Sequence, residues 1–140
     1  MRVVKISLFI LITGIMFMGC SKKVIKVLPK GTGDWNIVSF RYILYLNDVI
    51  FDDVTDTTNA GKFHFNKDLS GDSRIDTTFE NFTWLYNETA EQIQTISGTE
   101  TVTYDILECT RKTLTLYTTD SLDVFGTETR WQSTYKMEKL

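Results

Sequence analysis

Few side chains in this sequence have the types and the spacing that catalysis requires. His64 is the only histidine, and it stands between Phe63 and Phe65 in a segment where polar and apolar residues alternate. One histidine alone cannot build a Ser-His-Asp or Cys-His arrangement, so we expect it on the exposed face of a strand. Cys109 occupies a position where an apolar residue suits a core, and we predict a buried small side chain rather than a reactive thiol. The sequence therefore predicts neither an enzyme nor a bound metal or cofactor.

The segment that begins at Asn66 has the oxygen-bearing residues of a calcium-binding loop. Asn66, Asp68 and Ser70 stand at the first, third and fifth positions of such a loop, and Gly71 stands at the sixth. The twelfth position is Thr77 instead of the glutamate that binds calcium through both oxygens, and strands rather than helices are expected on either side. We therefore interpret the segment as a hairpin turn, which Asn, Asp and Gly favour.

The N-terminal segment carries a second cysteine in a position that suggests a modification. Arg2 and Lys5 precede an apolar run over residues 6–18, which is too short to span a bilayer and is typical of a signal peptide. The run ends in Gly19-Cys20, and this end resembles a bacterial lipobox. The resemblance implies that diacylglycerol is attached to the Cys20 thiol, that the chain is cut before Cys20, and that the new amine is acylated, for example with palmitate. The alternative is a plain membrane anchor or an ordinary secretory signal.

This interpretation divides the chain into three parts: a signal peptide over residues 1–19, the lipidated cysteine with a tether over residues 20–30, and a folded domain over residues 31–140. Two or three acyl chains hold a protein stably on a bilayer, which is therefore the expected partner of Cys20. Serine follows the cysteine, and by resemblance to known sorting rules this favours the outer membrane, with the protein facing the periplasm. Removal of residues 1–19 lowers the net charge from −3 to −5, which argues against nucleic-acid binding.

The rest of the chain is rich in threonine and aromatic residues, a composition that favours strands. Trp35–Leu46 is the first predicted strand, and Asn47-Asp48 is a two-residue turn into the next one, Val49–Val54. Residues 52–61 are polar and predict a loop, and so do residues 120–127.

Two later segments add to the predicted sheet. Residues 74–87 form one extended segment whose apolar positions shift by one residue, and we place a bulge at Glu80-Asn81 to account for the shift. Residues 128–138 alternate regularly, with Trp131, Ser133, Tyr135 and Met137 on a single face. We expect eight antiparallel strands in a meander and no helix after the signal. Such a meander closes into a barrel, which removes the exposed sheet edges, or folds into a sandwich of two sheets.

The order of several short motifs resembles the lipocalin-like barrels of Gram-negative lipoproteins, which belong to the calycin-type β-barrels. The motifs are Gly33-x-Trp35, a Phe-x-Phe-Asn-x-Asp-x-x-Gly hairpin over residues 63–71, Phe82-x-Trp84, Tyr104-x-Ile106, Leu114-x-Leu116 and a closing strand with Tyr135. The resemblance covers residues 31–140 and implies an all-β fold, an eight-stranded antiparallel meander that closes into a barrel. It also implies that Trp35 plugs one end of the barrel beneath a cation from a late strand, and Arg130 is the residue that we compare with this cation.

If the barrel closes, its interior is lined by a mostly aromatic set of side chains: Trp35, Phe63, Phe65, Phe79, Trp84, Tyr104, Leu116, Trp131 and Tyr135. All of them except Phe79 and Leu116 form the candidate ligand-binding set. These side chains either fill the barrel or line a pocket for one small apolar or amphipathic ligand. Arg41 joins the set if the first strand has no bulge, because it then shares a face with Trp35 and can hold an anionic ligand. A bulge or a twist instead turns Arg41 to solvent.

Two functions from different classes agree with these patterns. The first is a membrane-anchored, non-enzymatic, lipocalin-like lipoprotein that binds a small hydrophobic ligand in its barrel. The second is a protein–protein interaction module of the cell envelope, an inhibitor or an assembly partner, whose barrel is filled and whose loops or outer face do the binding. The sequence leaves the choice between them open.

The lipidation of Cys20 can be tested directly. The substitution Cys20→Ala removes the thiol that the modification requires, so the variant should incorporate no labelled palmitate and should accumulate as the uncleaved precursor. Metabolic labelling and the size of the chain on a gel measure both effects. Maturation of the variant to the wild-type size would show that the segment is an ordinary secretory signal.

Overall fold

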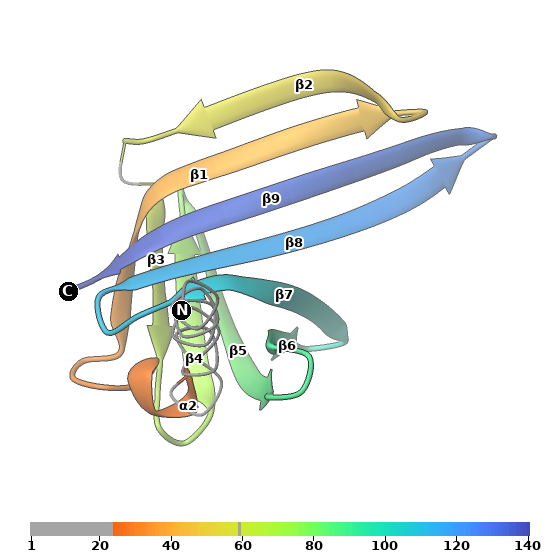
Figure 1. Cartoon of the computed structure of the whole chain (residues 1–140). Helices are drawn as coiled ribbons and strands as arrows, with labels where there is room; N and C mark the ends of the chain where they lie inside the picture. Colours follow the sequence, from red (N-terminus) through yellow and green to blue (C-terminus); the bar gives the residue numbers. More distant parts are fainter. Residues whose placement is uncertain (1–23, 59) are drawn as a thin grey trace, which may run out of the picture.

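The computed structural model describes residues 24–58 and 60–140, so the predicted signal peptide, Cys20 and the start of the predicted tether lie outside the described residues. Within this range the chain forms one helical turn and nine strands (Figure 1). In chain order they are α2 (Val24–Val27), β1 (Asp34–Leu46), β2 (Val49–Asp56), β3 (Gly61–Phe65), β4 (Ser70–Ile75), β5 (Thr78–Asn87), β6 (Gln92–Ser97), β7 (Glu100–Cys109), β8 (Thr113–Val124) and β9 (Thr127–Lys139).

Eight of the strands form a closed antiparallel barrel. The order β1-β3-β4-β5-β6-β7-β8-β9 is continuous, and β9 pairs with β1 to close it. The ninth strand, β2, pairs with β1 alone. The predicted all-β class and the closed eight-stranded meander are therefore confirmed, and the architecture is compatible with a calycin-like fold.

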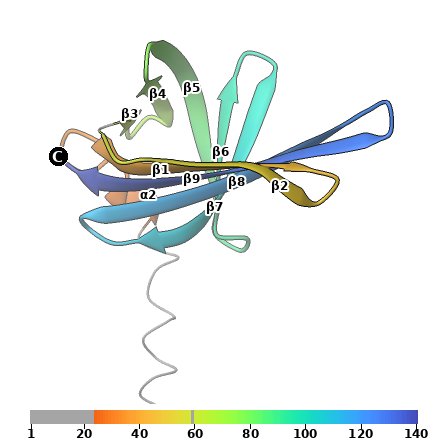
Figure 2. The same cartoon turned by 90° about the horizontal axis from the view of Figure 1, so that it is seen from above.

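Three barrel strands, β1, β8 and β9, continue past the barrel, and β2 pairs with β1 there. β1 pairs with β3 only over residues 34–37 and then with β2 over residues 40–46. On the other side of β1, strands β9 and β8 stay paired as far as Thr127 and Val124. The ends of β2, β1, β9 and β8 therefore make a sheet that projects beyond the barrel, as Figures 1 and 2 show. We call this sheet the arm and define it as residues 40–56 and 118–133.

Aromatic side chains occupy the interior of the barrel. The ring of Phe63 contacts the rings of Phe65, Tyr104 and Tyr135, with centroids between 5.7 and 6.2 Å apart. Trp84 extends this cluster through its edge-on contact with Phe65 at 5.6 Å. Phe63, Phe65 and Trp84 are at most 2% exposed, so they form a packed core. Such ring pairs contribute to stability beyond the area that they bury.

Trp35 and the residues before it close one end of the barrel. The Trp35 side chain is fully buried, and its Nε1 donates a hydrogen bond to the carbonyl of Leu28 at 3.0 Å. Val24 and Leu28 are also buried, and Val24–Val27 forms a helical turn, so this part of the predicted tether packs against the barrel and is not extended. Gly33 has φ of 76°, and a Cβ there would collide with the carbonyl of Phe65. This close approach explains the Gly-x-Trp spacing.

The cation above Trp35 comes from the last strand, but it is not Arg130. Lys139 Nζ lies 4.8 Å from the centroid of the Trp35 ring and donates a hydrogen bond to the Val27 carbonyl at 2.6 Å. Arg130 lies at the far end of β9, where its guanidinium stacks on Tyr45 at 4.2 Å. The comparison with Arg130 was wrong because the closed end of the barrel meets the last residues of β9 and not the first.

The single strand predicted over residues 74–87 and the bulge predicted within it were both wrong, for one reason. Residues 74–87 are two strands, because Asp76 adopts φ of 53° in a tight turn between β4 and β5. The register across Glu80 and Asn81 is continuous, so the shift in apolar positions comes from this hairpin and not from a bulge. The inward position predicted for Phe79 was wrong for the same reason: its side chain is 52% exposed and lies beside Arg74. The predicted turn at Asn47-Asp48 is confirmed by φ values of 48° and 63°, which a type I′ hairpin turn requires.

The predicted loops also contain strand residues. β2 continues to Asp56 and β8 continues to Val124, although both segments are rich in Asp and Thr. Their backbone groups pair with β1 and β9, which continue beside them. Pairing with a neighbouring strand therefore outweighs the weak intrinsic preference of Asp for strands.

The burial of Trp35 predicts a large loss of stability on truncation. The substitution Trp35→Ala should lower the free energy of unfolding by about 3–5 kcal/mol, because it leaves a cavity beneath α2 and removes the hydrogen bond to Leu28. Denaturant unfolding of the purified chain measures this. Phe125→Ala is the matched control: this aromatic side chain is fully exposed at the tip of the β8–β9 hairpin, and its loss should change the free energy by at most about 0.5 kcal/mol. Equal changes in the free energy of unfolding for the two substitutions would show that Trp35 does not close the end of the barrel.

Candidate binding site at the open end of the barrel

A cleft forms where β7 and β8 separate. The two strands pair only where Asp105–Cys109 lies opposite Leu114–Tyr117. Before Asp105, β7 stays with β6, whereas β8 follows β9 into the arm. The separation leaves a cleft of about 410 Å³ at the end of the barrel opposite α2.

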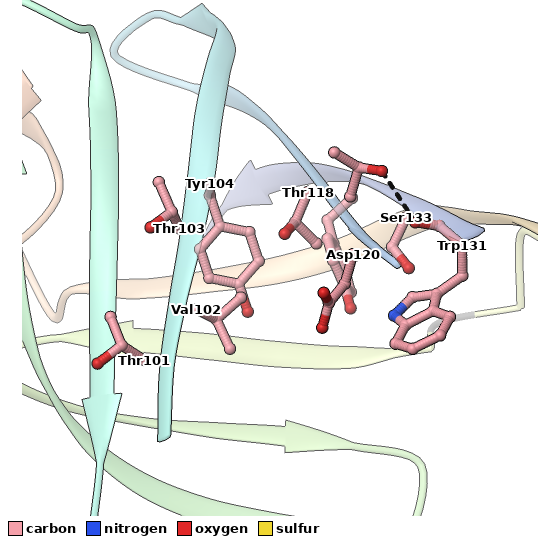
Figure 3. A pocket seen from close by; sticks show the side chains of 10 residues that line it. Thr101, Val102, Thr103, Tyr104, Thr118, Asp120, Trp131 and Ser133 are labelled. Carbon is pink, nitrogen blue, oxygen red and sulfur yellow. Dashed lines mark hydrogen bonds between the residues drawn. The ribbon is translucent and has the colours of Figure 1, made fainter. Parts of the chain in front are cut away.

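Three strands supply the walls of this cleft (Figure 3). The lining residues are Thr101, Val102, Thr103 and Tyr104 of β7, Thr118, Thr119 and Asp120 of β8, and Trp131, Ser133 and Tyr135 of β9. Aromatic rings and hydroxyl groups therefore dominate the lining. Thr119 Oγ1 donates a hydrogen bond to the Trp131 carbonyl at 3.1 Å, which ties β8 to β9 at the edge of the cleft.

Tyr104 and Tyr135 lie where the packed interior meets the cleft. Their rings contact edge-on with centroids 6.0 Å apart. Burial raises the pKa of the Tyr104 hydroxyl well above its usual range, and the charges of Tyr135 and Glu80 act in the same direction. Burial also raises the pKa of Tyr135, against a hydrogen bond from Ser133 that lowers it. Both phenols are therefore neutral at physiological pH and can serve a ligand as hydrogen-bonding groups.

The charge of the cleft is negative. Asp120 contributes a carboxylate to the lining, and its Oδ1 accepts a hydrogen bond from the backbone amide of Ser121 at 2.8 Å. Glu80 lies near enough for its charge to raise the pKa of Tyr104. None of the described lining residues is Lys or Arg. The cleft therefore favours a neutral or positively charged group over an anion.

The structure separates the predicted ligand-binding residues into three places. Tyr104, Trp131 and Tyr135 come together in the cleft, whereas Phe63, Phe65 and Trp84 lie in the packed interior and Trp35 lies at the closed end. Arg41 lies on the opposite face of the arm, where its Nη2 contacts Asp53 Oδ2 at 2.7 Å and its Nε donates to Asp53 Oδ1 at 2.9 Å.

A bulge explains the position of Arg41. The pairing of β1 with β9 shifts by one residue between Ile37 and Ser39, so the inward face passes from Trp35 and Ile37 to Phe40. Arg41 consequently faces outward, which is the alternative that the sequence had left open. Arg41 could bind an anionic ligand inside the barrel only if β1 had no bulge.

Thr118 and Asp120 are lining residues that the sequence analysis missed. The sequence predicts a loop over residues 120–127, because Asp is rare in strands. A weak signal was nevertheless present: Leu114, Leu116, Leu122 and Val124 share one parity along β8, and Asp120 lies on the same parity. The alternation persists through the polar residues because β8 continues beside β9.

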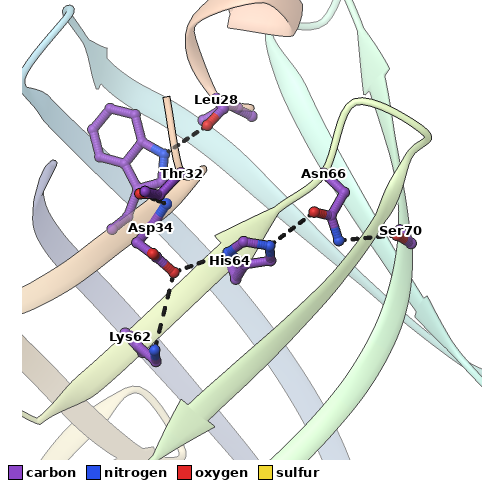
Figure 4. Close-up of polar contacts among 8 residues, drawn as sticks. Leu28, Thr32, Asp34, Lys62, His64, Asn66 and Ser70 are labelled. Carbon is purple, nitrogen blue, oxygen red and sulfur yellow. Dashed lines mark hydrogen bonds and ion pairs between the residues drawn. The ribbon is translucent and has the colours of Figure 1, made fainter. Parts of the chain in front are cut away.

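His64 is the centre of a polar cluster on the outside of the barrel (Figure 4). Its Nδ1 lies 2.9 Å from Asp34 Oδ1, and its Nε2 lies 2.8 Å from Asn66 Oδ1. Lys62 Nζ lies 4.0 Å from the same Asp34 oxygen. Both ring nitrogens face oxygen acceptors, so the cluster suits the protonated imidazole, which donates through both nitrogens.

The calcium-like segment is a hairpin turn between β3 and β4. Asp68 Oδ1 accepts a hydrogen bond from the Ser70 amide at 3.0 Å, and Asn66 Nδ2 donates to Ser70 Oγ at 3.1 Å. These side chains therefore stabilise the turn itself. Within residues 24–58 and 60–140, no group of three or more His, Cys, Asp or Glu side chains is arranged to hold a metal ion.

Comparison with known protein families, with curated proteins and with solved structures found no match for this chain. The described part of the chain also contains no helix with the length and apolar character needed to cross a membrane.

The surroundings of His64 predict a pH dependence of stability. Burial alone would lower the pKa of His64, but the hydrogen bonds with Asp34 and Asn66 and the charges of Asp34 and Asp72 raise it above 6.5. When a histidine has a higher pKa in the folded chain than in the unfolded chain, its protonation stabilises the fold. This stabilisation is complete at pH values below the pKa of the unfolded chain, and it is lost as the pH rises through the pKa of the folded chain. The free energy of unfolding should therefore fall as pH rises above about 6.5, the unperturbed pKa of histidine.

Denaturant unfolding at a series of pH values measures this slope. Because His64 is the only histidine, the variant His64→Gln should lose most of it. Asp34→Asn should reduce it, since it removes the charge that faces Nδ1. A slope that persists unchanged in His64→Gln would show that another group titrates.

Proposed function

We propose that this protein is a lipid-anchored, non-enzymatic interaction module of the cell envelope, in which the barrel is a scaffold and the arm binds a partner protein. The observation that carries this proposal is the uncovered inner face of the arm, by which we mean the face that continues the interior of the barrel. A sheet normally buries at least one apolar face against another layer. In the arm this face bears apolar side chains and has no layer over it among the described residues.

The apolar residues of the inner face remain exposed in the isolated chain. Leu122 is 55% exposed, Val54 is 49% exposed and Val124 is 44% exposed. Leu122 and Val124 lie next to each other on β8 at one edge of the arm, and Val54 lies on β2 at the other edge, so exposed apolar side chains border one continuous face on both sides. Exposed apolar surface of this kind marks sites where proteins associate.

The edges of the arm are also available to a partner. Within the described residues, β2 pairs only with β1, and β8 beyond Tyr117 pairs only with β9. Unpaired strand edges present backbone donors and acceptors that an additional strand can use. An interaction through the arm can therefore combine backbone pairing at an edge with burial of the inner face.

The proposed anchor would orient the arm away from the membrane. Cys20 precedes Val24 by only four residues, which reach at most about 14 Å. A lipidated Cys20 would hold the closed end, where α2 packs, close to the bilayer. Because the arm projects from the opposite end, its inner face would be presented to the periplasm if the protein resides in the outer membrane.

The cleft supports a second candidate function, the binding of a small ligand. Its volume of about 410 Å³ lies in the range of small-molecule sites. The aromatic rings of Tyr104 and Trp131 and the hydroxyl groups around them suit a neutral or cationic amphipathic molecule. A fatty acid fits less well, because the described lining offers its carboxylate no cation. Binding would take place at the mouth of the barrel, since the interior is filled.

Site-specific photo-crosslinking in cells tests the interaction function. A photoreactive amino acid in place of Leu122 should give one discrete protein adduct of the lipidated chain, because Leu122 lies on the inner face of the arm. Leu85 is the matched control, with 47% exposure on the outer surface of the barrel, and it should give none. A protein that only carries a small ligand would yield no adduct at Leu122, and that result would reject the interaction function.

A further inference from the structure

We propose that the inner face of the arm binds a partner segment with an apolar stripe flanked by Lys or Arg side chains. This inference rests on the proposed interaction function and specifies the chemistry of the partner. It follows from the sign and the positions of the charges on the arm, which the register of the four strands determines.

Three carboxylates lie on the inner face. Asp56 is opposite Phe40, and Asp52 is opposite Leu44, both across the β1–β2 pairing. Asp120 is opposite Trp131 across the β8–β9 pairing. Side chains of directly opposed residues in antiparallel strands point to the same side of the sheet. Each carboxylate therefore shares its side with the apolar residues of the inner face.

The basic residues of the arm lie on the other face. Arg41 is bound to Asp53, and Arg130 Nη2 contacts Asp48 Oδ1 at 3.0 Å. Of the described residues that the register places on the inner face, none is Lys or Arg. Both cations of the outer face are therefore paired within the chain, and that face also carries Asp123 and Glu128, which lie opposite each other near the tip of the arm. The carboxylates of the inner face, in contrast, have no cation beside them on that face.

The strand order places the carboxylates on the two sides of an apolar centre. The order across the arm is β2-β1-β9-β8. Asp52 and Asp56 lie on β2 at one edge, and Asp120 lies on β8 at the other. Tyr42, Leu44 and Trp131 belong to the two strands between them. Three strand spacings separate the edges, which corresponds to about 14 Å.

This width suits one element of secondary structure. A helix with its side chains is about 10–12 Å across, so an amphipathic helix can cover the apolar centre while long Lys or Arg side chains on its two flanks reach the carboxylates. The cleft provides a further place for one such cation, because the Trp131 ring and the Asp120 carboxylate lie side by side there.

The same charges argue against two other occupants. A second copy of this chain would bring carboxylates of one inner face against those of another, and like charges in an interface are unfavourable. An anionic lipid surface would be repelled by the three carboxylates for the same reason. A basic amphipathic segment satisfies both the apolar centre and its acidic borders.

The experiment uses the photoreactive residue at position 122 in the full lipidated chain in cells. The triple variant Asp52→Asn, Asp56→Asn and Asp120→Asn keeps the hydrogen-bond acceptors of these side chains but removes their charge. It should lower the yield of the adduct at least tenfold. The charge-preserving variant with Glu at the same three positions should retain it. The matched control is a triple variant that removes three exposed charges near the closed end of the barrel and should leave the yield of the adduct unchanged. Its substitutions are Glu88→Gln, Glu91→Gln and Glu138→Gln.

Each outcome separates this inference from the function on which it rests. If wild-type chain gives the adduct and the Asn variant gives it equally, the inference is wrong while the interaction function stands. If wild-type chain gives no adduct, the interaction function itself fails. Mass spectrometry of the cross-linked peptide is the second measurement: a partner peptide with Lys or Arg next to apolar residues supports the inference. A peptide of this same chain, or an acidic one, overturns it.

Discussion

The pairing of β1 with β9 is the interaction on which the rest of the structure depends. It runs from Trp35 opposite Lys139 at the closed end to Leu46 opposite Thr129 near the tip of the arm. The first part of this pairing closes the barrel. The second part continues into the arm, where β2 pairs with β1 and β8 pairs with β9 at the two edges. Because the same two strands continue, the face that lines the interior becomes the inner face of the arm. The core and the proposed binding surface are therefore parts of one sheet.

The contacts between aromatic rings show how this continuity links stability to the site. The rings of Phe40 and Tyr135 are in tilted contact, with centroids 5.0 Å apart, at the point where β1 and β9 leave the barrel. Tyr135 also contacts Phe63 in the core and lines the cleft. The walls of the cleft are therefore held by the packed interior, so a partner would meet a preorganised surface. Preorganisation reduces the entropy that binding costs.

The two faces of the arm differ in how their charges are satisfied. On the outer face, Arg41 and Arg130 pair with carboxylates of the same chain. These pairs are exposed and contribute little to stability, but they show that the outer face carries cations as well as carboxylates. The inner face combines apolar side chains with carboxylates that have no cation on the same side. This asymmetry is the physical basis for assigning the inner face, rather than the outer one, to a partner.

The plug by Trp35 was expected only from a resemblance to other barrels, since it depends on contacts with residues far away in the chain. Local patterns in the sequence were sufficient for the all-β class, the Asn47-Asp48 turn and the inward face of β9, because each depends on residues that are close together in the sequence. Tyr104, Trp131 and Tyr135 were predicted to face inward for the same reason. The arm, the cleft and the outward position of Arg41 depended on tertiary structure. The arm and the cleft follow from which strands continue past the barrel, and the position of Arg41 follows from one extra residue between Ile37 and Ser39. The alternation of polar and apolar residues in a single strand determines neither how far that strand pairs with its neighbour nor in which register.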